Sequence, residues 1–165
     1  MRRTTSAFVV LAGLMASGEY VLPAAAQGEP PPIAAEMLTP RSVVVDDVNL
    51  KFRIKLDGNA TGVIGVEDPS STVVVRYTVQ PAAQFPWHSH AGPVVVNLVS
   101  GALTYVGAED CVPRTYSSGE AFVDPGQGHV HTAYNLTTEP IVFVATFFDA
   151  PAEGSLLIPA APGGC

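Results

Sequence analysis

The chain has 165 residues, of which 47% are hydrophobic, 8% aromatic and 14% charged, a composition typical of a single globular domain rather than a disordered or repeat protein. Its formal net charge is −7 at pH 7, whereas nucleic acids and anionic membrane surfaces are bound by clusters of Lys and Arg. The composition therefore excludes nucleic acid as an expected partner.

The first 26 residues have the pattern of a secretory signal peptide. Arg2 and Arg3 form a basic start, residues 7–16 are apolar, and residues 24–26 are small, as at a cleavage site. The apolar stretch is shorter than the roughly 20 residues that a membrane-spanning helix needs. We therefore predict a secreted or periplasmic protein with no membrane span in its mature form. The proline-rich residues 27–40 are predicted to be a linker with at most one helical turn, at 33–38.

Residues 41–150 contain short β-branched and apolar runs separated by Gly, Pro, Asn and Asp, and no stretch sustains a helical period. This pattern predicts an all-β sandwich or barrel. The run 141–148 is apolar on both faces and predicts a strand that closes the core. Residues 93–99 and 102–106, joined by a turn at Ser100 and Gly101, predict a hairpin. The other expected strands are 43–45, 48–56, 72–80, 114–116, 120–124 and 129–135.

The two cysteines lie in a polar loop, at Cys111, and at the last residue, Cys165. An even number of cysteines in an exported protein favours a disulfide, and two exposed free thiols are the alternative. A Cys111–Cys165 bond would attach the C-terminal tail, residues 151–165, to the body of the domain.

The four histidines form two pairs of the same spacing, His88 with His90 and His129 with His131. Side chains two residues apart on a strand lie on the same face, so each pair can direct two imidazoles at one point. Such imidazoles would bind one divalent transition metal, namely zinc, iron, copper, nickel or manganese. Two exposed loops with no shared geometry are the alternative.

At these residues the sequence resembles the cupin superfamily. The resemblance extends over residues 73–148 and implies an antiparallel jelly-roll β-barrel, a single domain with one metal ion inside, held by His88, His90 and His131. The residues that match the first family motif are His88, Ser89, His90 and Gly101, and those that match the second are Gly119, Pro125, Gly128, His131 and Asn135.

The sequence departs from the two motifs at two places. Val94 and Val95 stand where the family has a glutamate ligand, so the usual carboxylate is missing. The second motif has one extra residue, which puts Gln127 at the expected glycine position and leaves His129 open as a fourth ligand or an outer partner. On a continuous strand, Val94 would share a face with the histidines and make the wall beside the metal apolar.

A three-histidine site without a carboxylate leaves the charge of the metal uncompensated, so we expect a small anionic ligand. The first hypothesis is a secreted metal-binding cupin without catalytic activity. The alternative is a metal-dependent enzyme, dioxygenase-like or isomerase-like, that acts on a small organic acid. A homodimer formed through barrel edge strands is compatible with both. The candidates for supporting roles around the metal are Trp87, Gln127, Tyr134 and Asn135.

Overall fold

The computed structural model describes residues 31–55, 62–67, 71–162 and 164–165, so the predicted signal peptide lies outside the described residues. Every regular element in these ranges is a β-strand. No helix in this part of the chain is long and apolar enough to cross a membrane.

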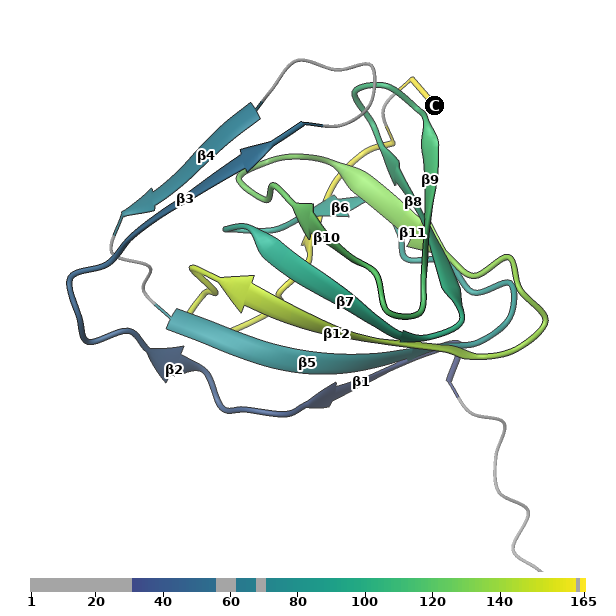
Figure 1. Ribbon diagram of the computed structural model, residues 1–165, viewed down its shortest axis with the longest axis horizontal. Coiled ribbons are helices and arrows are strands. Elements are labelled where there is room, and N and C mark those ends of the chain that lie inside the picture. Colours follow the sequence, from purple (N-terminus) through teal and green to yellow (C-terminus); the bar gives the residue numbers. More distant parts are fainter. Residues whose placement is uncertain (1–30, 56–61, 68–70, 163) are drawn as a thin grey trace, which may run out of the picture.

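Two antiparallel sheets face each other and enclose one core, as the ribbon in Figure 1 shows, which confirms the expected all-β jelly-roll fold. The first sheet has the order β1 (Ile33–Met37), β5 (Ser71–Val79), β12 (Ile141–Phe148), β7 (Val94–Ser100) and β10 (Ala121–Asp124), and β2 (Ser42–Val43) also pairs with β5. The second has the order β13 (Ile158–Pro159), β6 (His88–Ser89), β11 (His131–Tyr134), β8 (Ala102–Gly107) and β9 (Pro113–Ser117).

The core lies between the two sheets and is built by strands that alternate buried and less buried residues. Along β12 the buried side chains are Ile141, Phe143, Ala145 and Phe147, and the residues between them are only partly buried. The expected central strand is therefore present, but only one of its faces is fully buried. An antiparallel sheet of a two-layer fold packs one face on the core and leaves the other near solvent.

The predicted hairpin between residues 93 and 106 is wrong, although both strands exist. β7 pairs with β10 and β12 in the first sheet, whereas β8 pairs with β9 and β11 in the second. The chain therefore crosses between the sheets at Gly101. This glycine has φ 75°, and a Cβ there would run into the side chain of Ile141, so the corner requires glycine.

The predicted linker with a helical turn is also wrong for residues 33–37. These residues form β1, which pairs along β5 from Ile33↔Val79 to Met37↔Val75. Extended pairing satisfies the backbone groups on the outer edge of β5, which a single helical turn would leave unpaired. The C-terminal tail likewise adds a strand, β13, to the second sheet.

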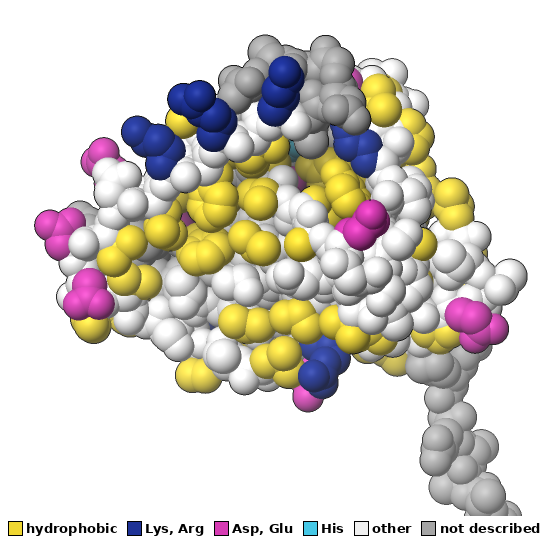
Figure 2. Space-filling model, in the orientation of Figure 1, with side chains coloured by type: hydrophobic (Ala, Val, Ile, Leu, Met, Phe, Trp, Pro, Cys, Tyr) yellow, Lys and Arg dark blue, Asp and Glu magenta, His cyan; other side chains and the backbone are white. Residues whose placement is uncertain are grey.

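A separate two-stranded ribbon, β3 (Asn49–Ile54) with β4 (Gly62–Glu67), stands beside the barrel (Figure 1). Lys51 and Arg53 point to solvent from β3, and Lys and Arg side chains gather along this side of the molecule in Figure 2. Phe52, on the opposite face of β3, packs on Phe148 of β12 with ring centroids 5.8 Å apart. The ribbon thus contacts the barrel through its apolar face.

Candidate metal centre

Three of the four histidines meet inside the barrel. His88, His90 and His131 are only 4%, 6% and 4% exposed. Their ring centroids lie 4.2 to 5.1 Å apart, and one ring nitrogen of each lies within 4.8 Å of the other two. This spacing is compact enough for three nitrogen ligands to share one metal ion.

Pairing between β6 and β11 explains why residues distant in the sequence meet. His131 and His88 are direct cross-strand partners, and side chains opposite each other on an antiparallel pair lie about 5 Å apart. His90 follows β6 by one residue and, at two residues from His88, lies on the same side. The order of strands in the second sheet therefore brings the two motifs together.

Each of the three rings is oriented by a hydrogen bond at Nδ1. Because carbonyl and carboxylate oxygens can only accept hydrogen bonds, Nδ1 of each ring is the donor and carries the hydrogen. The free lone pair is then on Nε2. Metal-binding histidines are normally held in this way by an outer acceptor. The acceptors are the Pro86 carbonyl for His88 (2.7 Å), the Leu156 carbonyl for His90 (2.8 Å) and the His129 carbonyl for His131 (3.4 Å). Asp124 Oδ2 also lies 3.1 Å from His131 Nδ1, within ion-pair distance.

Burial keeps the three imidazoles neutral. Desolvation is the main cause that lowers the pKa of His88 and of His90, and it lowers the pKa of His131 to about 3. A neutral imidazole has the free lone pair that a metal requires. The three residues therefore fit a divalent transition metal in charge state, orientation and spacing.

We expect the metal-free protein to lose stability as the pH falls from about 6.5, the unfolded-state pKa of histidine, towards 3. In this window the unfolded chain binds a proton at His131 that the folded chain excludes, because its folded pKa is about 3. Urea unfolding of chelator-treated protein at several pH values measures the slope, and a His131→Gln variant should show a smaller one. Equal slopes for the two proteins would contradict the expectation.

The space beside the three rings is small and mostly apolar. A cavity of about 40 Å³ is lined mainly by apolar and aromatic side chains, with the three histidines and Asp124 as its strongly polar members. Val94 and Val96 are in this wall, as the sequence predicts. The strand is interrupted between His90 and β7, however, and does not continue as the expected single strand. The side chains of Phe85 and Phe147 pack directly on His88 and His90.

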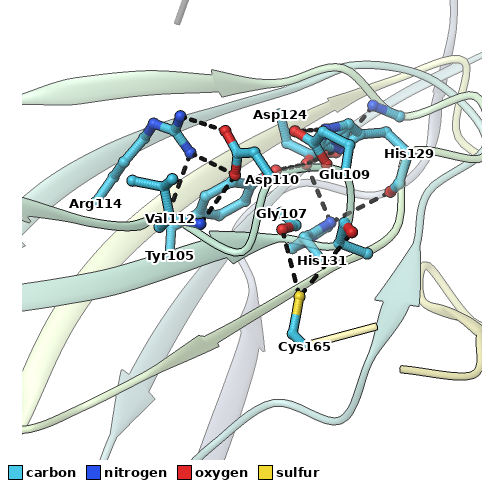
Figure 3. Close-up of polar contacts among 12 residues, drawn as sticks. Tyr105, Gly107, Glu109, Asp110, Val112, Arg114, Asp124, His129, His131 and Cys165 are labelled. Atoms are coloured by element: carbon cyan, nitrogen blue, oxygen red, sulfur yellow. Dashed lines mark hydrogen bonds and ion pairs between the residues drawn. The ribbon is translucent and has the colours of Figure 1, made fainter. Parts of the chain in front are cut away.

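Asp124 is a site residue that the sequence reasoning missed. It ends β10 and is 1% exposed. It accepts hydrogen bonds from the Tyr105 hydroxyl at 2.7 Å (Figure 3) and from the Gly126 backbone N–H at 2.9 Å. Its Oδ2 also lies 3.1 Å from His131 Nδ1. A carboxylate at the end of an apolar strand, directly before Pro125 and Gly126, was the signal in the sequence.

His129 lies apart from the three-histidine cluster. Its Nε2 is 2.9 Å from Glu109 Oε1, and its Nδ1 is 3.9 Å from Asp124 Oδ2 (Figure 3). A second group of potential ligands, Asp124, His129 and His131, has its atoms within 4.8 Å of one another. His131 Nδ1 already faces Asp124, however, so His129 lies on the outer side of His131, away from the other two ligands.

The remaining candidates have structural contacts and are not among the described residues that line the cavity. Gln127 donates to the Gly65 carbonyl of the ribbon at 3.0 Å. Asn135 is fully buried and donates to the carbonyls of Val79 and Glu139. Tyr134 pairs with Thr104, and the Trp87 carbonyl accepts from Ala160.

The Cys111–Cys165 disulfide is present, with a Cα–Cα distance of 5.4 Å. It attaches the end of the chain to the loop that follows β8. Disulfides persist mainly in oxidising compartments, so this bond is compatible with an extracellular or periplasmic protein.

No protein-family model matches the sequence, and no curated protein matches it. Solved structures are similar in fold. A conserved protein with a double-stranded beta-helix domain from Klebsiella pneumoniae has a TM-score of 0.46 and 23% identity, over 54% of this chain and 76% of that one. The Cupin_2 domain of a transcriptional regulator from Enterobacter cloacae has a TM-score of 0.49 and 15% identity, over 73% of this chain and 99% of that one. The DMSP lyase DddQ from Ruegeria pomeroyi has a TM-score of 0.47 and 16% identity, over 55% of this chain and 44% of that one.

Proposed function

We propose that the chain is an exported metal-binding protein with a small-molecule site, because its two sheets enclose three histidines that could hold one ion. His88, His90 and His131 would hold one divalent transition metal, either zinc, iron, copper, nickel or manganese. The observation that carries the proposal is that all three rings are buried and each has a hydrogen-bond acceptor at Nδ1.

A bound metal would act as a Lewis acid towards a ligand at its open position. Three neutral imidazoles and one nearby carboxylate, Asp124, leave a divalent centre positively charged, which favours a monoanion or hydroxide there. A water molecule needs about 10–15 Å³ of such space. The cavity of about 40 Å³ therefore supports a ligand of only a few heavy atoms.

Turnover of a small organic acid by a dioxygenase-like or isomerase-like reaction is the second candidate. The observation that favours it is the apolar wall of Val94, Val96 and Phe147 beside the histidines, which suits a small neutral molecule such as dioxygen. Oxygen uptake by the metal-loaded protein across a panel of small acids tests this candidate. Metal binding without uptake or conversion would leave the binding function alone.

Metal content of protein purified without a histidine tag is the direct test of the proposal. We expect close to one transition-metal ion per chain after chelator treatment and reconstitution, measured by elemental analysis. Metal binding should also raise the free energy of unfolding, by about 2.7 kcal/mol when the free metal is at 100 times its Kd. Absence of metal after reconstitution with each of the five metals would overturn the proposed function.

A further inference from the structure

We propose that Asp124 is the positioning residue of the centre, a carboxylate that enters the barrel opposite Val94 and acts on His131 rather than binding the metal itself. It would hold the His131 ring in its metal-binding orientation and place a negative charge beside the metal. This inference rests on the proposed metal-binding function and adds to it a residue outside the three-histidine set.

Strand register explains how the carboxylate reaches this place. β10 and β7 are antiparallel neighbours, and Asp124 is the direct partner of Val94. Side chains directly opposite each other on adjacent strands point to the same face of the sheet, with Cβ atoms about 5 Å apart. A carboxylate at residue 124 therefore enters the same part of the barrel interior as one at residue 94 would.

The contacts of Asp124 make it a fixed hydrogen-bond acceptor. The residue is 1% exposed. Oδ1 accepts from the Gly126 N–H at 2.9 Å, and Oδ2 faces both the Tyr105 hydroxyl at 2.7 Å and His131 Nδ1 at 3.1 Å. Burial of a carboxylate is costly unless such partners surround it, so a buried carboxylate 3.1 Å from a histidine nitrogen points to a role at that histidine.

The geometry places Asp124 behind His131 rather than on the metal. The cluster of mutually close ligand atoms that contains His88 and His90 is completed by His131 and does not include Asp124. Asp124 faces Nδ1, the nitrogen opposite the free Nε2. This is the arrangement of carboxylate, histidine and metal in which the outer carboxylate fixes the ring and raises its basicity as a ligand.

An Asp124→Asn variant tests the proposal, because the amide has nearly the same shape but loses one acceptor oxygen and the charge. Cobalt(II) affinity is measured by competition with a chelator at constant pH. We expect an affinity about 10- to 100-fold weaker than that of the parent, the usual effect of removing an outer partner. We also expect a shifted visible spectrum of the cobalt-loaded protein, which a purely structural residue would not change.

Asp110→Asn is the matched control. Asp110 also accepts from a backbone N–H two residues ahead, that of Val112 at 3.0 Å, and pairs with Arg114 at 2.6 Å (Figure 3), but it is not among the described residues that line the cavity beside the histidines. We expect its cobalt affinity and spectrum to match those of the parent. Parent-like affinity and spectrum in a folded Asp124→Asn variant would overturn the inference.

A measurement on the unmodified protein keeps the proposal falsifiable if Asp124→Asn does not fold. Nitrogen-15 NMR of the metal-free protein should show the His131 proton on Nδ1, because Asp124 Oδ2 and the His129 carbonyl both lie beside that nitrogen. A proton on Nε2 would overturn the inference. A parent protein that binds neither cobalt nor any of the five proposed metals would instead overturn the proposed function, so the two failures are distinguishable.

Discussion

Replacement of His131 by alanine is expected to abolish high-affinity metal binding. His131 is the only ligand candidate from β11, and its ring centroid lies 4.2 Å from that of His88 and 5.1 Å from that of His90. Loss of one of three imidazoles removes a direct metal bond. The affinity should therefore fall by more than the roughly 10- to 100-fold effect of an outer partner, as measured by chelator competition on the folded variant.

His129→Ala is the matched control, because this histidine is only two residues away and differs in its surroundings. It contacts Glu109 and lies outside the cluster formed with His88 and His90. We expect metal content equal to that of the parent. The stabilisation of the parent by saturating metal should persist in His129→Ala and disappear in His131→Ala. Equal metal loss in both variants would show that the geometry of the cluster has been assigned incorrectly.

The strands of the fold are predictable from the sequence because alternation and turn residues are local signals. Residues 71–79 and 141–148 are rich in β-branched and apolar residues, bounded by turn residues, and form the neighbouring strands β5 and β12. The sheet that a strand joins is set by contacts distant in the sequence. A short turn at Gly101 fits a hairpin as well as a corner, and only the packing against Ile141 distinguishes them.

The histidines of the candidate site are recognisable in the sequence, whereas their hydrogen-bond partners are not. The spacing of His88 and His90 is a local pattern, and the second motif identifies His131. Asp124 enters through the register of β10 against β7, which no local pattern encodes. The acceptor for His90 is a backbone carbonyl, that of Leu156, and a backbone group carries no side-chain signature at all.

Because the acceptor for His90 lies in the C-terminal tail, we expect the disulfide to affect the candidate metal centre as well as stability. β13 pairs with β6, with Pro159 opposite His88, and the Leu156 carbonyl accepts from His90. The tail therefore contacts two of the three candidate metal ligands. Its far end is attached to the barrel by the Cys111–Cys165 bond, which spans 54 residues of sequence.

A Cys111→Ser, Cys165→Ser double variant is expected to lose about 4 kcal/mol of unfolding free energy, the value that chain entropy gives for a loop of this length. It should also bind metal about 10-fold more weakly, because a looser tail holds the acceptor of His90 less firmly. Urea unfolding and chelator competition measure the two effects, and reductant should change the parent but not the double variant. Parent-like metal affinity in the folded double variant would mean that β13 holds the tail on β6 without the disulfide, and the bond would then act on stability alone.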